Sequence, residues 1–514
     1  MKHLSFRSDF QITSMAAAVL LLASCGGGSG DGPIGAFGTS APATSTPVAA
    51  TPVGTLPAPV ATQADTAAPI AVASTATGST AGTVTGFGSV IVDGKRIDDN
   101  AATPQAEADD GLLKNVELKL GHHVEVLHDD KLIASRILIA PEVRGPVSAV
   151  DLAAQTFTVL GQTVKINALA ASGPVTIFEA PYARLADIRN GDMIEVHALI
   201  QRDGSDGATL QATRIEQHAP GALGMVKGIV SELSTSGKAF KVGGLRVSLD
   251  DAPVTPARSA LENGAEVVVR VPANASGAVA TASAVRVKDR KAAMSGHDVS
   301  LAGPIGQVDT ARKTFVVDGV SVTADKAVLE SGQKLDNLVA GQYVRVKGVL
   351  EGGILSAATV ALPANEQEPG GEAELHGSIT AFASNAIFKV RGIRVDASNA
   401  KIICQAPALL SENLQVGVKG HPLSSGMVIA AEVKCEAAVD DKSVVGRVGQ
   451  VAKLDVDKQT LTLGSGPTAL TVTWTDGTVF VGLDASTLRD KKLEVEGKLR
   501  GSVLTATKIK REDS

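Results

Sequence analysis

Residues 314–322 read Thr-Phe-Val-Val-Asp-Gly-Val-Ser-Val, and this stretch decides the fold. Apolar and polar residues alternate on both sides of Gly319, which predicts two antiparallel strands with one buried face, joined by a tight turn. The pattern recurs along the chain, as in residues 156–164 around Gly161. A hairpin of this kind is therefore the basic unit of the fold.

Three further sequence motifs recur around the hairpin. A Gly followed two residues later by a β-branched residue precedes it, as in Gly303-Pro304-Ile305. A fourth strand follows another Gly, as in 341–348, and a closing strand reads Leu-x-Ala-x-x-Val, as in 355–360. Five short strands with one variable stretch before the fourth predict a small closed barrel of the OB type. A string of small β-sandwiches is the alternative.

The chain has 514 residues, which is too long for one hydrophobic core and predicts several domains. Aromatic residues make up only 3% of it, so we expect aliphatic cores with a recurrent Phe. The repeats predict an all-β protein of about six tandem five-stranded OB-like barrels after a disordered tether. The predicted parts are a signal peptide with lipobox (1–25), a Gly/Ala/Thr/Pro tether (26–83), and repeats 1 to 6 (84–140, 143–218, 225–290, 300–362, 373–437 and 444–511).

The N-terminus carries an export signal. Residues 15–23 form an apolar run that is too short to span a bilayer but fits the core of a secretory signal. The following Leu22-Ala23-Ser24-Cys25 resembles the lipobox of bacterial lipoproteins. In that family the Cys thiol receives a diacylglycerol, which implies that Cys25 is the lipidation site and anchors the chain to the membrane. A plain signal peptide with an incidental Cys is the alternative.

The residue after the lipobox bears on location. Gly26 stands where an Asp often signals retention at the inner membrane in Gram-negative lipoproteins. By this resemblance we expect an outer-membrane anchor with the chain facing the periplasm, and display on the cell surface is the alternative.

The recurring phrases together resemble a known family. The Gly-x-Val opening, the Thr-Phe-x-Val hairpin, the Gly-x-x-Val-x-Val-x-Gly strand and the Leu-x-Ala-x-x-Val ending are similar to a bacterial domain of unknown function of the DUF5666 type. That OB-like domain occurs in tandem in exported proteins and lipoproteins. The resemblance is strongest at 143–218 and 301–362 and implies the fold, but it brings no characterised activity or site.

Two cysteines remain once Cys25 is assigned to lipid. Cys404 and Cys435 both fall in repeat 5. Because an exported protein reaches an oxidising compartment, we expect them to form a disulfide. Two separate buried thiols are the alternative.

His122, His123 and His128, with Asp129 and Asp130, are the metal candidates in the sequence. Neighbours on a strand point to opposite faces, so His122 and His123 cannot both bind one ion from regular structure. A solvated strand edge and turn is the alternative, and we predict no metal and no other cofactor.

Positive residues line the hairpins of repeats 3 and 5, namely Lys241, Arg246, Lys389, Arg391 and Arg394. On alternate strand positions such residues usually form a solvated face. A shallow surface for an anionic ligand is the alternative, because OB barrels bind polymers across that sheet.

Charge and motifs restrict the function. The net charge of −6 is spread without long runs, which argues against a nucleic-acid partner. The sequence contains no metalloprotease, nucleophile-elbow, Walker or dinucleotide motif, so we expect no enzyme. We predict a non-catalytic cell-envelope lipoprotein that displays its repeats as an interaction or structural array, with envelope proteins or polysaccharide as partners. A binding module for an envelope polysaccharide or small ligand is the alternative, and an enzyme is the third choice.

Overall fold

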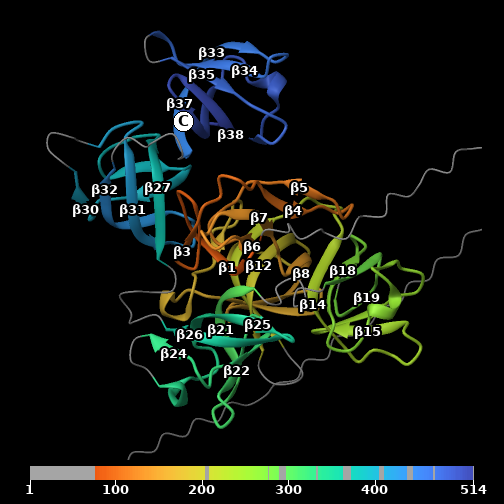
Figure 1. Cartoon of the computed structure of the whole chain (residues 1–514). Helices are drawn as coiled ribbons and strands as arrows, with labels where there is room; N and C mark the ends of the chain where they lie inside the picture. The colour runs from red at the N-terminus through yellow and green to blue at the C-terminus, as the bar shows by residue number, and fades with distance from the viewer. Residues whose placement is uncertain are drawn as a thin grey trace, which may run out of the picture. The chain divides into compact units, whose positions relative to one another are not determined.

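The computed structural model describes residues 76–202, 208–275, 277–288, 297–330, 334–362, 372–404, 410–436, 444–466 and 469–512. Within these ranges the protein is all-β, with strands making up 56% of the structure. Every element labelled in Figure 1 is a strand, and the helical structure of the described ranges is limited to short 3-10 turns. None of the described helical turns is long and apolar enough to cross a membrane.

Repeat 2 illustrates the strand pairing, which recurs with small differences in the other repeats. Its strands are β8 (Val143–Asp151), β9 (Thr156–Val159), β10 (Gln162–Ile166), β11 (Ile177–Phe178), β12 (Met193–Arg202) and β13 (Ala208–Gln217). β8, β9 and β10 pair antiparallel one after another, and β10 runs parallel to β13. β12 then pairs antiparallel with both β13 and β8. The unit thus combines an antiparallel hairpin with a parallel return strand.

The other repeats supply the remaining strands in the same order. Repeat 1 contains β1 (Gly78–Phe87), β2 (Val90–Val92), β3 (Lys95–Ile97), β4 (Pro104–Glu107), β5 (Leu113–Asn115), β6 (His123–His128) and β7 (Ala134–Ile139). Repeat 3 contains β14 (Gly224–Ser231), β15 (Ala239–Val242), β16 (Leu245–Ser248), β17 (Val254–Thr255), β18 (Glu266–Val271), β19 (Val279–Thr281) and β20 (Ala284–Lys288).

Repeat 4 contains β21 (Asp298–Asp309), β22 (Thr314–Val317), β23 (Val320–Thr323), β24 (Val328–Glu330), β25 (Tyr343–Glu351) and β26 (Ile354–Ala361). Repeat 5 contains β27 (Ala373–Thr380), β28 (Ile387–Val390), β29 (Ile393–Asp396), β30 (Lys401–Ile403), β31 (Gln415–Pro422) and β32 (Val428–Cys435). Repeat 6 contains β33 (Val444–Asp455), β34 (Thr460–Leu463), β35 (Leu470–Thr473), β36 (Val479–Val481), β37 (Lys492–Arg500) and β38 (Val503–Arg511).

The prediction of six separate small OB-like barrels is wrong. The ladders continue across repeats and form sheets of 19, 13 and 6 strands. β1 runs parallel to β21 and to β27, and β8 pairs antiparallel with β14, so repeats share their opening strands. The strands wind into a β-solenoid of about 11 turns. Sequence alternation specifies pairing inside a hairpin, but an edge strand offers its free N–H and C=O groups to any neighbour.

The start of repeat 1 also differs from the prediction. The tether was expected to run to residue 83, whereas residues 78–83 belong to β1 and pair with β6. Small Gly, Ser, Thr and Ala residues can form a buried strand here because β6 and β21 flank β1 on its two sides.

In four of the two-residue hairpin turns, a residue with a side chain precedes a glycine. Both turn residues have positive φ, as in a type I′ turn, at Asp93-Gly94, Leu160-Gly161, Asp318-Gly319 and Arg391-Gly392. The first residue of each turn contacts a different repeat. Asp93 meets Tyr343 of repeat 4, Leu160 packs beside Gly224 of repeat 3, and Arg391 pairs with Glu496 of repeat 6. The turn tips thus join the repeats to one another.

The recurrent Phe of each hairpin lies in the core, as the alternation predicts. Phe157, Phe240, Phe315 and Phe388 are all buried and are surrounded by Val, Leu and Ile. In repeat 6 the corresponding position is Leu461, and Trp474 fills the core instead. Aliphatic burial around an aromatic ring therefore stabilises repeats 2 to 6.

The contact between Asp93 and Tyr343 joins repeats 1 and 4 through buried polar groups. The Tyr343 hydroxyl donates to Asp93 Oδ1 at 2.5 Å, and the Thr83 N–H donates to Oδ2 at 2.9 Å. Burial raises the pKa of Asp93 from 3.8 to about 6, although the bond from Tyr343 and the charge of Arg345 oppose the rise. Near neutral pH, therefore, a buried carboxylate is charged at this contact.

The raised pKa predicts a pH-dependent stability. Because the folded protein binds the Asp93 proton more tightly than the unfolded chain, this stabilisation is present at low pH and is lost as pH rises through about 6. The shift corresponds to about 3 kcal/mol. Asp93→Asn keeps an acceptor for Thr83 and places a donor toward the Tyr343 oxygen.

We expect the thermal midpoint of Asp93→Asn, relative to the wild type, to be several degrees higher at about pH 7.5 than at about pH 4.5. A difference between the two proteins that is equal at both pH values would contradict a buried titrating carboxylate.

Candidate functional site

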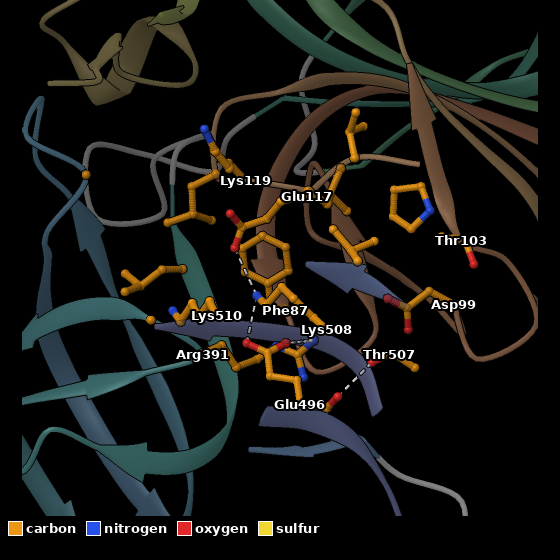
Figure 2. A pocket seen from close by; sticks show the side chains of 18 of the residues that line it. Phe87, Asp99, Thr103, Glu117, Lys119, Arg391, Glu496, Thr507, Lys508 and Lys510 are labelled. Atoms are coloured by element: carbon orange, nitrogen blue, oxygen red, sulfur yellow. Dashed lines mark hydrogen bonds and ion pairs between the residues drawn. The ribbon is translucent and has the colours of Figure 1, made fainter. Parts of the chain in front are cut away.

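A cavity of about 1030 Å³ lies among the described residues. Segments of four repeats line it, as Figure 2 shows for a part of the wall. Repeat 1 contributes residues 99–104 and 116–120, and repeat 2 contributes residues 177–180. Repeat 5 contributes residues 391–394, and residues of β37 and β38 complete the wall from repeat 6.

A chain of ion pairs crosses the cavity wall between repeats 1, 6 and 5. Lys508 Nζ lies 3.0 Å from Glu117 and 2.8 Å from Glu496, and Glu496 lies 3.4 Å from Arg391 (Figure 2). Burial alone would raise the pKa of Glu496, but the charges of Lys508 and Arg391 outweigh it and lower that pKa to about 2. Glu496 is therefore ionised and holds two cations at the wall.

The neighbouring Glu494 has a different environment. Its side chain is fully buried, and Lys510 Nζ lies 2.9 Å away. Burial raises the pKa of Glu494, and the charge of Lys510 offsets this only in part. Lys510 and Lys508 of β38 thus lie opposite Glu494 and Glu496 of β37 in one antiparallel ladder.

Arg391 is the cation that projects from a turn tip. Its guanidinium carbon lies 5.8 Å from the ring centroid of Phe87, which is a cation–π distance. Its Nη2 pairs with Glu496, whereas its Nη1 is buried and has no hydrogen-bond partner among the described residues. The sequence suggested a solvated hairpin face or a shallow anionic surface for this residue, and the structure instead places its side chain in the wall of a cavity, 11% exposed.

The lining carries more positive than negative groups. Seven cationic side chains and four carboxylates line the cavity: Lys119, Arg214, Arg391, Arg394, Lys498, Lys508 and Lys510, with Asp99, Glu117, Glu179 and Glu496. Burial raises the pKa of Asp99, and the charge of Arg391 opposes this rise. The apolar part of the lining includes Phe87, Ile177, Phe178, Ile393, Met427 and Val479. The cavity therefore combines an apolar wall with an excess of cations.

A second charged cluster forms the repeat 2 end of the cavity. Glu179 accepts from Lys119 at 2.7 Å and from Arg214 at 2.9 Å. Arg214 also donates from Nε to Glu216, which lies behind the wall. Burial would raise the pKa of Glu216, but the hydrogen bond from His122 and the charge of Arg214 lower it strongly.

The three histidines that the sequence singled out lie in three different surroundings. His122 contacts Glu216 at 3.3 Å, and His123 lies 3.9 Å from Asp318. His128 instead contacts the Thr80 hydroxyl at 3.0 Å and the Asp129 carbonyl. All three side chains are buried, so the interpretation of this segment as a solvated strand edge is wrong for them. Contacts with repeat 2 cover His122 and contacts with repeat 4 cover His123, which the sequence of β6 alone does not indicate.

A different trio has the composition of a metal site. One ligand atom from each of His122, His197 and Glu216 lies within 4.8 Å of the others, and the two rings stack at 4.5 Å. Two His and one Glu is a known zinc ligand set. Sequence reasoning missed His197 and Glu216 because they come from repeat 2, which the single-repeat pattern does not place beside repeat 1.

The hydrogen bonds of this trio favour a structural role. His122 Nδ1 accepts the Lys119 N–H at 3.3 Å, which leaves the proton on Nε2, where it donates to Glu216. Burial lowers the pKa of His122 to about 3, so the ring is neutral. Arg214 and Lys119 already neutralise Glu216, and a metal ion would add charge beside two cations.

The cysteines divide between the described and undescribed parts of the chain. Cys404 and Cys435 form a disulfide, with their Cα atoms 4.8 Å apart and a sequence separation of 31. The bridge ties the segment after β30 to the end of β32, beside the core of repeat 5. Cys25, the predicted lipidation site, lies outside the described residues.

Comparison with known proteins identifies the repeats. Residues 144–216, 302–361 and 448–510 match the family model of a domain of unknown function (DUF5666). The three matches follow one another along the chain, which is consistent with a tandem-repeat domain of unknown function. The resemblance to the DUF5666 domain that the hairpin and strand motifs indicated is thus confirmed. The matched DUF5666 segments coincide with repeats 2, 4 and 6, so the cavity is lined by two matched repeats and by repeats 1 and 5.

Other comparisons add little. The search among curated proteins found no match. Among solved structures, drosophila Unr CSD456 is similar over 42% of this chain and 98% of that chain, with 11% identity and a TM-score of 0.12. A TM-score this low supports no argument about fold or function.

The disulfide predicts a measurable stabilisation of repeat 5. Removing it with Cys435→Ser frees a loop of 31 residues in the unfolded chain and should lower the free energy of opening of repeat 5 by about 3–4 kcal/mol. Hydrogen exchange of peptides from β28 and β31 measures this change, with peptides from repeat 2 as the internal control. The double variant Cys404→Ser/Cys435→Ser should match the single variant. An additional loss in the double variant would show that the thiols act separately.

Proposed function

We propose that this protein is a non-catalytic binding protein of the bacterial cell envelope, and that the cavity between repeats 1, 2, 5 and 6 is its ligand site. The tandem repeats act as the structural array that builds the site. A lipid on Cys25 anchors the chain at the outer membrane. Partner chemistry is a small molecule or saccharide of the envelope rather than a nucleic acid.

The cavity is the observation that carries this proposal. Its volume of about 1030 Å³ is at the upper end of the range for small-molecule sites. Such sites combine an apolar wall with a few convergent polar groups, and both are present here. The charged groups also come from different repeats, so the site exists only when the repeats pack together.

The composition of the lining supports binding rather than catalysis. The described lining residues include no His and no Cys, the commonest general base and thiol nucleophile. Three of the four lining carboxylates, Glu117, Glu179 and Glu496, are each held by a cation within 3.4 Å, and the fourth, Asp99, lies in the field of Arg391. Carboxylates fixed in this way are poor proton acceptors, because the neighbouring charge favours their ionised form.

Filling the cavity tests the site. Ser425 is exposed in the turn between β31 and β32 and lines the cavity, so Ser425→Trp should fill part of it with little effect on the core. Native mass spectrometry of protein isolated without denaturation from envelope membranes should show a bound small molecule in the wild type and its loss in Ser425→Trp.

Thr235→Trp is the matched control, because Thr235 is an exposed turn residue of repeat 3 that does not line the cavity. This variant should keep the bound molecule. A wild-type spectrum without any bound molecule, or one unchanged by Ser425→Trp, would contradict the proposed site.

Lipidation is tested separately. Cys25→Ala removes the only thiol of the lipobox, so the variant should not incorporate a radiolabelled fatty acid and should leave the membrane fraction. Fractionation and labelling of the wild type in parallel provide the control. A variant that stays membrane-associated and is processed as the wild type is would refute the lipoprotein anchor.

A further inference from the structure

We infer that the cavity binds an anionic amphiphile, that is, an organic molecule with one carboxylate or phosphate group and an aliphatic body, and that Arg391 and Lys498 hold the anion. This inference rests on the proposed function and adds the chemical class of the ligand.

The pairing of the lining charges indicates where an anion would bind. Lys508 is shared between Glu117 and Glu496, and Lys510 faces Glu494. Lys119 and Arg214 are likewise engaged by Glu179 and Glu216. Within the described part of the chain, no carboxylate lies within ion-pair distance of Lys498 or Arg394. The surplus positive charge is therefore concentrated at repeats 5 and 6.

Arg391 is only half engaged. Among the described residues, Glu496 is the one carboxylate within ion-pair distance of Arg391, and it contacts Nη2 alone. A guanidinium carries five N–H donors, so the part of Arg391 that faces the cavity can donate to an oxyanion while Nη2 keeps its contact with Glu496. Phe87 lies against its face and restricts its orientation.

Lys498 supplies the second cation. It lies two residues after Glu496 on β37, so the two side chains share one face of the strand, and both line the cavity. Lys498 Nζ donates to the Asn100 carbonyl at 3.2 Å. An ammonium has three donors, so the remaining donors can bind an anion without breaking this contact.

The apolar wall determines the rest of the ligand. Ile177, Ile393, Met427 and Val479 present aliphatic surface, and Met adapts its shape to a flexible chain. Saccharide and base binding sites rely on aromatic stacking platforms, and Phe87 is already covered by Arg391. The lining therefore fits an aliphatic chain better than a sugar.

Four probes with ten-carbon chains test the class of ligand. Sodium decanoate and decyl phosphate carry the two candidate anions, decyltrimethylammonium carries a cation, and decyl glucoside is neutral. Titration calorimetry on the full mature chain, below the micelle concentration of each probe, should show at least about tenfold tighter binding of an anionic probe than of the other two. Whichever of decanoate and decyl phosphate binds more tightly identifies the headgroup as a carboxylate or a phosphate.

Two variants locate the anion. Arg391→Gln and Lys498→Gln should each weaken binding of the anionic probe about tenfold, and should change binding of decyl glucoside by less than about twofold. Arg312→Gln is the matched control, because Arg312 is an 82% exposed turn residue of repeat 4 that pairs only with Asp309 among the described residues. Lys498→Gln keeps the inference testable if Arg391→Gln fails to fold.

The outcomes separate this inference from the proposed function. Equal binding of the four probes, or tighter binding of decyl glucoside, would overturn the anionic class. If no probe binds but Ser425→Trp still removes a copurifying molecule, the ligand class is wrong and the binding site stands. If neither effect is seen, both proposals fail.

Discussion

The two-residue hairpin turn is the constraint on which the rest of this structure depends. Asp93-Gly94, Leu160-Gly161, Asp318-Gly319 and Arg391-Gly392 hold both residues at positive φ, which fixes the register of each hairpin and exposes the first side chain at its tip. Glycine at the second position allows this conformation at little cost. The tip residue is then free to vary, and it makes the contacts between repeats. The same turn geometry thus places Leu160 in an apolar junction, Asp93 in a buried polar contact and Arg391 in the cavity wall.

The tip residues explain why the repeats are joined rather than separate. Leu160 adds apolar contact between repeats 2 and 3, and Gln162 beside the turn donates to the Val242 carbonyl at 2.8 Å. Asp93 and Asp318 bring two carboxylates into the junction of repeats 1 and 4. Arg391 meets repeat 6, which has its own six-stranded sheet and therefore contacts the other repeats through side chains rather than through a shared ladder.

The sequence predicts what is local and misses what joins the repeats. Alternation around Gly319 and the recurrent Phe are local signals, and they identify the hairpins and the buried rings correctly. Pairing of β1 with β21 and β27 depends on strand edges that look alike in every repeat, so no pattern selects it. For the same reason the sequence predicts a solvated side chain for Arg391 and does not predict the contacts of His122 with His197 and Glu216. These sites depend on which repeats meet.

The ion pair between Lys508 of repeat 6 and Glu117 of repeat 1 spans the cavity wall at 3.0 Å, so it tests most directly whether the repeats enclose a common site. Zero-length carbodiimide crosslinking at low protein concentration, followed by peptide mass spectrometry, joins only a lysine and a carboxylate in contact. The account predicts an intramolecular Lys508–Glu117 link, with the Lys458–Asp455 pair inside repeat 6, at 2.8 Å, as the positive control. Recovery of the Lys458–Asp455 link without the Lys508–Glu117 link would contradict the account.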